Sequence, residues 1–224
     1  MTLWEEDDNE DLSKAPERVV DLSFAVESKT IAIDHAQQLQ NEITRLLPWF
    51  AEHTGCALHL IHGAESGNGW HRPEGEDAII HLSRRTRFRL RLPAERVEEA
   101  KRLEHSELNI DNHPLRLGGS SVKLLALTTA LYSRHVVCHQ EDEALFLNDC
   151  AANLKDHGIL VKKIMAGKEH YIRHAEGPLR TRSLFIADLS YRQGIKLQED
   201  GMGCYQTLGC GVFIPHKTPY AIHR

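Results

Sequence analysis

The chain has 224 residues, a formal net charge of −5 and 15 histidines. With 41% hydrophobic and 26% charged residues, its composition is that of a folded protein and excludes a largely disordered chain. Five cysteines without a Cys-x-x-Cys pair exclude a disulfide scaffold, and no apolar run approaches the roughly 18 residues of a membrane span. We therefore expect a cytoplasmic protein with reduced thiols and no membrane partner.

The acidic charge is concentrated near the N-terminus. Six Asp and Glu side chains lie within residues 5–11, so the rest of the chain carries +1. We expect residues 1–17 to form a solvated, disordered tail. A neutral remainder with clustered basic groups keeps nucleic-acid binding open.

The first half of the chain alternates between strand and helix patterns. Residues 18–26 alternate apolar and polar side chains, which predicts a strand. Asp34 is a suitable N-cap, and apolar residues at helical spacing predict an amphipathic helix over residues 35–53. The further elements expected here are a strand at 57–61, a loop at 63–75, a strand at 85–92, a short helix at 93–103, a hairpin at 108–117 and a strand at 122–127.

A similar order of patterns returns in the second half. The elements expected there are a strand at 131–138, a helix at 142–157, strands at 159–165, 171–174 and 179–189, a helix at 190–199 and a strand at 210–214. The β-α-β-β-α-β order therefore occurs twice. It predicts an α+β fold with two tandem ferredoxin-like domains, residues 18–128 and 129–224.

Arginines occupy every second position of one predicted strand. Because strand side chains alternate between faces, these guanidinium groups should share one face. They are Arg85, Arg87, Arg89 and Arg91, with Arg84 next to them. Such a row spans about 20 Å and suits several phosphates of a nucleic-acid backbone. The alternative is a solvated face paired with nearby acids, but no acid interrupts the row, which favours RNA or DNA.

A glycine-rich stretch near the C-terminus is the second signal. It follows a predicted helix and leads into a strand, the reverse of the Rossmann and P-loop contexts. Its glycines would let backbone N–H groups approach a phosphate, and nearby lysines add positive charge. The alternative is a helix C-cap followed by a β-bulge. The predicted RNA-binding residues here are Lys196, Gly201, Gly203, Gly209, Gly211 and Lys217.

Residues 208–217 of this stretch resemble the signature of CRISPR-associated RNA-processing endoribonucleases of the RAMP superfamily. Residues 20–24, 33–35, 45–49 and 82–87 agree with one subtype of that family, so the resemblance covers most of residues 18–217. It implies two ferredoxin-like (RAMP/RRM-like) domains and metal-independent cleavage of CRISPR repeat RNA in a precursor transcript. Members of this family often stay bound to the repeat-derived end of their product within a surveillance complex, so the resemblance implies guide RNA and other subunits of such a complex as partners.

The chemistry implied by this resemblance needs a proton acceptor. The ribose 2′-hydroxyl attacks the neighbouring phosphate, a base removes its proton, and the product carries a 2′,3′-cyclic phosphate. The resemblance implies His35 as this base, and the start of a helix would keep its ring neutral. The alternative is an exposed first-turn residue. Lys29 and His62 are weaker candidates; His59 and His62 should point to opposite faces of one strand, so at most one faces the site.

Two other functions compete with RNA cleavage. The first is a catalytically inactive RAMP-type subunit that binds RNA in a surveillance complex. The second is metal binding by the histidines. Because neither His135 nor His170 lies in a Cys-x-x-Cys or His-Glu-x-x-His context, we predict neither a metal site nor a cofactor.

Overall fold

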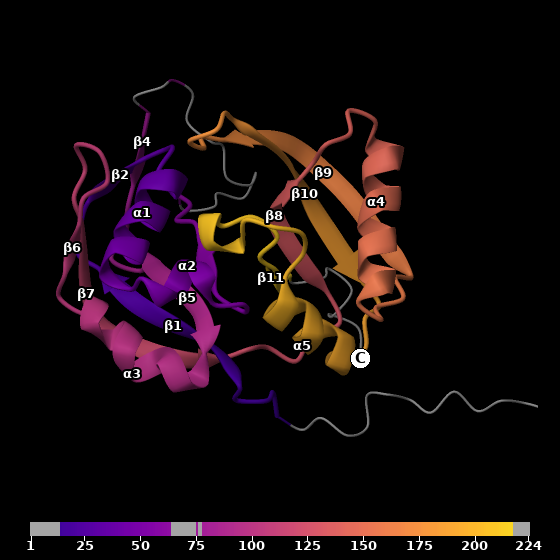
Figure 1. Cartoon of the computed structure of the whole chain (residues 1–224), viewed down its shortest axis with the longest axis horizontal. Helices are drawn as coiled ribbons and strands as arrows, with labels where there is room; N and C mark the ends of the chain where they lie inside the picture. Colours follow the sequence, from indigo (N-terminus) through magenta and orange to yellow (C-terminus); the bar gives the residue numbers. More distant parts are fainter. Residues whose placement is uncertain (1–13, 64–74, 76–77, 217–224) are drawn as a thin grey trace, which may run out of the picture.

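The computed structural model describes residues 14–63, 75 and 78–216, which form two β-sheet units side by side (Figure 1). Most of the predicted acidic tail and Lys217 lie outside these residues. The N-terminal unit contains β1 (Val19–Val26), β2 (Thr30–Ala32), α1 (Ala36–Leu46), α2 (Trp49–Glu52), β3 (Ala57–His59), β4 (Ile79–His81), β5 (Arg87–Pro93), α3 (Val97–Ala100), β6 (Glu107–Leu108) and β7 (Leu115–Leu124). The C-terminal unit contains β8 (Leu131–Val137), α4 (Glu143–Asp156), β9 (Lys163–Ile172), β10 (Leu179–Ala187), α5 (Tyr191–Asp200) and β11 (Ile214–Pro215).

Both units have the strand order of a ferredoxin-like fold. The N-terminal sheet runs β3-β5-β1-β7-β6 and the C-terminal sheet runs β11-β8-β10-β9, while β2 and β4 pair separately. In each large sheet the first and third strands of the β-α-β-β-α-β repeat lie in the middle. The predicted α+β fold with two tandem ferredoxin-like units is confirmed.

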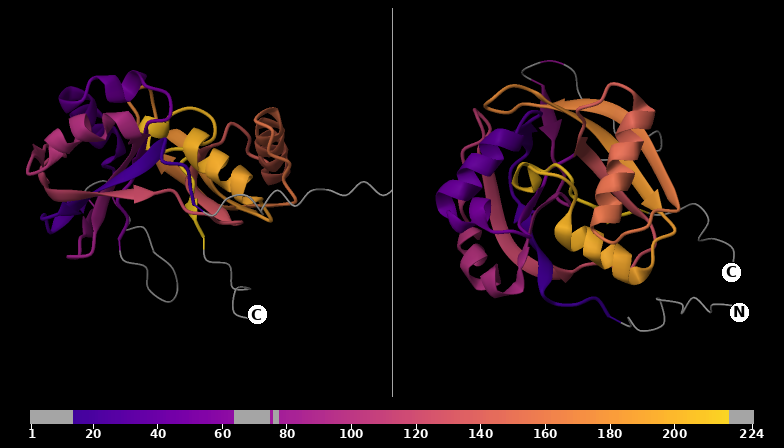
Figure 2. Two further views of the ribbon diagram at one scale, coloured as in Figure 1. Left: turned by 90° about the horizontal axis from the view of Figure 1, so that it is seen from below. Right: turned by 45° about the vertical axis from the view of Figure 1, so that its right-hand side comes forward.

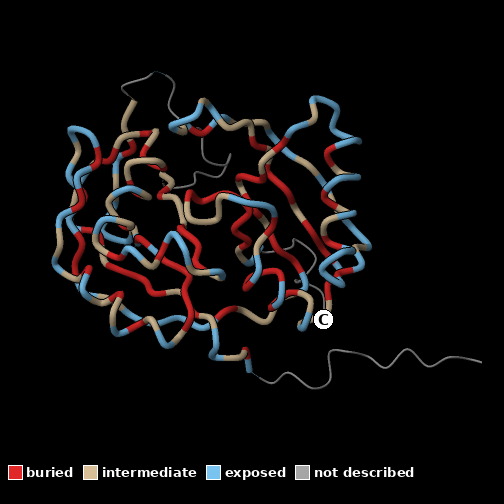
Figure 3. Tube along the Cα trace, viewed as in Figure 1, coloured by how far each residue is buried: buried red, intermediate tan, exposed pale blue. Residues whose placement is uncertain are grey.

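Alternating side chains give each sheet one buried face. In the N-terminal sheet, Leu22 faces Leu90 and Phe24 faces Phe88 in register, and all four are fully buried. The trace coloured by burial shows this buried path along the strands (Figure 3). The helices of both units lie on the same side of the two sheets (Figure 2, left), so the opposite sheet faces share the other side of the molecule.

The helix predicted over residues 35–53 is interrupted. It consists of α1 and α2, and Leu47 between them has non-helical geometry with φ −131° and ψ 79°. Proline disfavours helical geometry in the preceding residue, so Pro48 ends the first helix and begins the second. The N-cap also differs from the expectation, because it is His35 rather than Asp34 and its side chain makes no capping bond.

Several strand boundaries differ as well. The residues predicted as a hairpin and a separate strand form β6 and one continuous ten-residue strand, β7. Similarly, β9 joins two of the predicted strands. The last strand, β11, has only two residues, because the glycine-rich stretch before it folds as a loop. Among the described residues, no helix has the length and apolarity needed to cross a membrane.

Candidate active site between the two units

A groove of about 150 Å³ lies where the two units meet. Histidines and arginines from both units line it, together with the end of the glycine-rich stretch. Its lining includes His59, His62, Arg87, Arg89, Arg134, His135, Gly209 and Ile214. Cationic and proton-transferring groups thus converge on one surface although they are far apart in the sequence.

Three histidine rings form a cluster beside this groove. The ring centroids of His62 and His135 are 6.0 Å apart with planes inclined by 30°, and those of His135 and His170 are 5.6 Å apart. The Thr181 hydroxyl donates to the His170 carbonyl and lies 3.1 Å from Nδ1 of His135. Because the Thr181 hydroxyl uses its single proton in the bond to His170, it can only accept from His135, so Nδ1 of His135 is the donor. The other ring nitrogen, Nε2, then carries the lone pair of the neutral ring.

His35 lies next to this cluster but is almost completely buried, with 3% of its surface exposed. Its Nδ1 is 2.9 Å from the Ala32 carbonyl, to which it can only donate, and its Nε2 accepts a hydrogen bond from the Ile61 backbone N–H at 3.1 Å. The ring is therefore held in one tautomer, with its Nε2 lone pair directed at the residue before His62. A cavity of only about 10 Å³ connects His35 with His62 and His135.

The arginine strand is divided between two roles. Arg87 and Arg89 are exposed and line the groove, as the alternation predicted. The prediction that Arg91 contacts RNA is wrong, because this residue is only 1% exposed and its side chain is bonded within the protein. Arg84 and Arg85 are exposed in the turn before β5 and do not line the groove.

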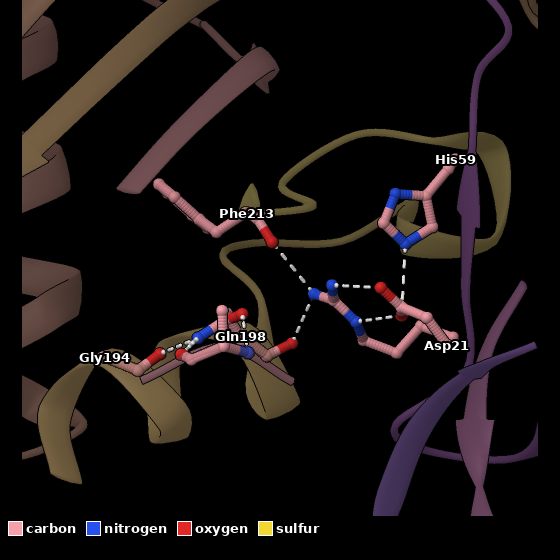
Figure 4. A network of polar contacts seen from close by, with 7 residues as sticks. Asp21, His59, Gly194, Gln198 and Phe213 are labelled. Atoms are coloured by element: carbon pink, nitrogen blue, oxygen red, sulfur yellow. Dashed lines mark hydrogen bonds and ion pairs between the residues drawn. The ribbon is translucent and has the colours of Figure 1, made fainter. Parts of the chain in front are cut away.

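Arg91 instead joins the two units through a buried network (Figure 4). It binds both carboxylate oxygens of Asp21, at 2.8 and 3.1 Å, and donates to the Gln198 and Phe213 carbonyls at 2.7 and 3.0 Å. Burial opposes ionisation of Asp21, but Arg91 and His59 together hold the pKa of this carboxyl below its ordinary value. Burial also lowers the pKa of His59, although Asp21 lies 3.3 Å from its Nε2 and partly opposes that shift.

The glycine-rich stretch packs mainly against the protein itself. The Gly211 N–H donates to the His135 carbonyl at 2.6 Å, and the Gly209 N–H donates to Gln206. A Cβ on Gly209 would lie 2.6 Å from the Leu60 side chain, so this glycine allows close contact with the N-terminal unit. The loop thereby holds β8 and the segment before His62 together. Gly201 and Gly203 line a different depression, of about 430 Å³, with residues 51–57.

The predicted lysines do not join the groove. Lys29 lies in a separate depression with Glu107 and Arg116, and Lys196 forms a 2.7 Å ion pair with Asp200 along α5. The expectation that only one of His59 and His62 faces the site is wrong, because β3 ends at His59 and His62 lies beyond the strand.

Sequence reasoning missed two residues of the groove. Arg134 and His135 are adjacent in β8, and we had considered His135 only as a metal ligand. Their signal was weak, because adjacent strand residues normally point to opposite faces, so one Arg-His pair does not predict a shared basic surface. Within residues 14–63 and 78–216, no group of three or more His, Cys, Asp or Glu side chains has the arrangement of a metal site.

The chain folds as two ferredoxin-like units that meet at a groove of histidines and arginines. The Cas6 family model, described as Cas6 Crispr, matches residues 20–218. The chain therefore belongs to the Cas6 family of CRISPR RNA-processing proteins.

Individual relatives agree with this assignment. The CRISPR-associated endonuclease Cas6 of Myxococcus xanthus (strain DK1622) is 28% identical over 197 residues, which are 88% of this chain and 81% of the relative. A solved CRISPR-associated protein Cas6 superposes with a TM-score of 0.65 at 12% identity, covering 89% of this chain and 99% of the other. A RAMP protein described as binding different RNA substrates gives a TM-score of 0.57 at 13% identity, covering 88% and 98%. The two structures establish the fold alone.

Proposed function

We propose that this protein cleaves CRISPR repeat RNA in the precursor transcript without a metal ion, in the cytoplasm, and releases guide RNA with a 2′,3′-cyclic phosphate end. The observation that carries the proposal is the groove that combines His62 and His135 with Arg87, Arg89 and Arg134. Arginines can bind the scissile phosphate and stabilise the charge that develops on it, while histidine can transfer protons near neutral pH. The products of this chemistry are one end with a cyclic phosphate and one with a 5′-hydroxyl.

The positions of the histidines suggest a division of roles. His62 is half-buried and lines the groove, so it can contact the 2′-hydroxyl as general base. His35, the base implied by the family resemblance, is buried and acts as a positioning residue, because its Nε2 accepts the Ile61 N–H and so fixes the backbone next to His62. His135 stacks on His62 and supplies a second ring that can exchange protons.

The test is single-turnover cleavage of a labelled repeat RNA in EDTA, with the wild-type protein and with His62→Ala, His35→Ala and His139→Ala. His139 is an exposed histidine outside the groove and serves as the matched control. We expect His62→Ala to slow cleavage about 10²- to 10⁴-fold, as for loss of a general base, and His139→Ala to have no effect. A positioning role predicts that His35→Gln, which can still accept the Ile61 hydrogen bond, keeps most of the activity.

Each contrary outcome has a definite meaning. Full cleavage by His62→Ala together with loss of cleavage by both His35 variants would move the base to His35. A requirement for magnesium would reject the metal-free mechanism. Tight binding of RNA that stays intact would instead assign the protein to the non-cleaving subunits of a surveillance complex. We also propose that the protein stays with other subunits of such a complex, which co-purification with its bound guide RNA would test.

A further inference from the structure

The C-terminal sheet carries a row of large apolar side chains on the face away from its helices. Met165, Phe185, Tyr132 and Ile214 lie in register on β9, β10, β8 and β11. The neighbours on either side of Phe185 in β10, Leu184 and Ile186, belong to the buried core. The row therefore crosses all four strands on the opposite face, where Figure 2 (left) shows no helix of either unit.

This face is hollowed and apolar where a solvated sheet face would normally be polar. A depression of about 700 Å³ is lined by Tyr132, Met165 and Phe185, with His216 at its edge. Met165 is 59% exposed. The His216 ring lies 5.0 Å from Phe185 and 5.8 Å from Tyr132, measured between centroids. An apolar, aromatic patch of this kind on a sheet marks a binding surface rather than a solvated one.

The surroundings of the row favour a polyanion that carries flat rings. Lys163 lines the same depression in a 2.9 Å ion pair with Asp188, and the guanidinium carbon of Arg134 lies 5.9 Å from the centroid of the Tyr132 ring. Arg134 also lines the arginine and histidine groove, as does Ile214. The aromatic row and that groove are thus parts of one continuous surface, so a strand whose phosphates follow the arginines would bring its bases over the rings.

The placement of the two rings matches a known way of binding single-stranded RNA. Four-stranded sheets of this topology stack two or three bases on aromatic side chains of their two central strands. Here β8 and β10 are the central strands, and Tyr132 and Phe185 face each other across them. Stacking needs no particular base, because every base has a flat π face.

We infer that Tyr132 and Phe185 form a stacking platform for unpaired bases of the RNA that continue beyond the groove. The inference rests on the proposed function in one respect, since RNA is the ligand of both surfaces. It adds a second contact region, distinct from the cleavage groove, that takes single-stranded RNA with little base preference.

The test measures binding of a fluorescein-labelled single-stranded oligouridine by anisotropy. We expect Tyr132→Leu and Phe185→Leu each to weaken binding about tenfold, the loss of one stacked base. Tyr132→Phe keeps the ring and should bind as the wild type does. Tyr171→Leu is the matched control, because Tyr171 is an exposed tyrosine of the same sheet that does not line the depression. Photocrosslinking with 5-iodouridine should label peptides that contain Tyr132 or Phe185.

The outcomes separate this inference from the cleavage proposal. If the wild type cleaves repeat RNA but both leucine variants bind oligouridine normally, the platform is wrong and the cleavage proposal stands. If oligouridine binding falls as expected while the wild type leaves repeat RNA intact, the platform stands alone. Self-association in sedimentation experiments that Tyr132→Leu and Phe185→Leu abolish would assign the face to a second copy of the chain and overturn the inference. Unfolding curves of the variants verify that they are folded.

Discussion

Neighbouring histidines of the N-terminal unit differ in chemistry because their surroundings differ. His35 is buried with both ring nitrogens bonded, whereas His62 is half-buried in a groove of arginines. His59 lines the same groove, but it is mostly buried and lies beside the ion pair of Asp21 with Arg91. In the proposed mechanism, burial and hydrogen-bond partners rather than residue type distinguish His62, the proposed base, from His35.

His59 should make the protein less stable in mild acid. Burial lowers its pKa in the folded state, so below about pH 6.5 the unfolded chain takes up a proton that the folded protein does not. The contribution of neutral His59 to the free energy of unfolding is therefore fully present above that pH. It is lost as the pH falls, by at most about 1.4 kcal/mol per pH unit for one proton. We expect His59→Gln, which still can donate to Asp21, to lose less of its free energy of unfolding between pH 7.5 and 5 than the wild type.

Urea unfolding followed by tryptophan fluorescence measures this difference. The exposed His139→Gln is the control and should follow the wild-type curve. The measured pH range ends at pH 5 so that Asp21 does not titrate within it. The pKa of Asp21 is lowered in the folded protein, so the stability that Asp21 contributes is lost only below about pH 3.8, the ordinary pKa of its carboxyl group. Identical pH curves for wild type and His59→Gln would contradict the assigned role of His59.

At the scale of elements, the glycine-rich loop packs closely against the rest of the protein. Gly203 and Gly211 both have left-handed backbone geometry, with φ of +71° and +64°. A Cβ on Gly203 would meet open space, whereas one on Gly211 would lie 1.9 Å from the Met202 carbonyl oxygen. We expect Gly203→Ala to cost about 1–2 kcal/mol of stability from backbone strain alone, and Gly211→Ala to cost clearly more. Chemical unfolding of the two variants compares them directly, and equal costs would show that the loop can relax around Gly211.

The loop also shows how far the sequence could predict this molecule. The order and type of the helices and strands in both units could be predicted from apolar periodicity, because each unit buries one sheet face with residues close in the sequence. The glycine pairs were visible, but their close contacts, with Leu60 and Met202, depend on how the chain folds back and have no local signature. Period two likewise placed Arg91 beside Arg87 and Arg89 without indicating that the C-terminal unit covers it.

At the scale of the whole molecule, buried and half-buried polar contacts join the two units. Arg91 of β5 donates to the Gln198 and Phe213 carbonyls of the C-terminal unit, and Gln40 of α1 donates to the Thr207 hydroxyl at 2.9 Å. The groove needs residues from both units, so its geometry depends on this junction. A fixed junction keeps the histidines and arginines of the N-terminal unit aligned with Arg134 and His135 of the C-terminal unit.

Two arginines of β5 test whether the units behave as one body. Arg91→Met leaves the mostly buried Asp21 carboxylate without its arginine partner, with only His59 beside it, and should cost about 3–5 kcal/mol. Arg89→Met removes an exposed side chain and should change stability by less than about 0.5 kcal/mol. Hydrogen exchange across a urea series reports β1 and β10 separately. In the wild type and in Arg89→Met the two strands should lose protection at the same urea concentration. In Arg91→Met, β1 and β10 should lose protection at different urea concentrations. Different midpoints in the wild type would mean that the units unfold independently, and that the groove is assembled by a contact weaker than the network around Arg91 implies.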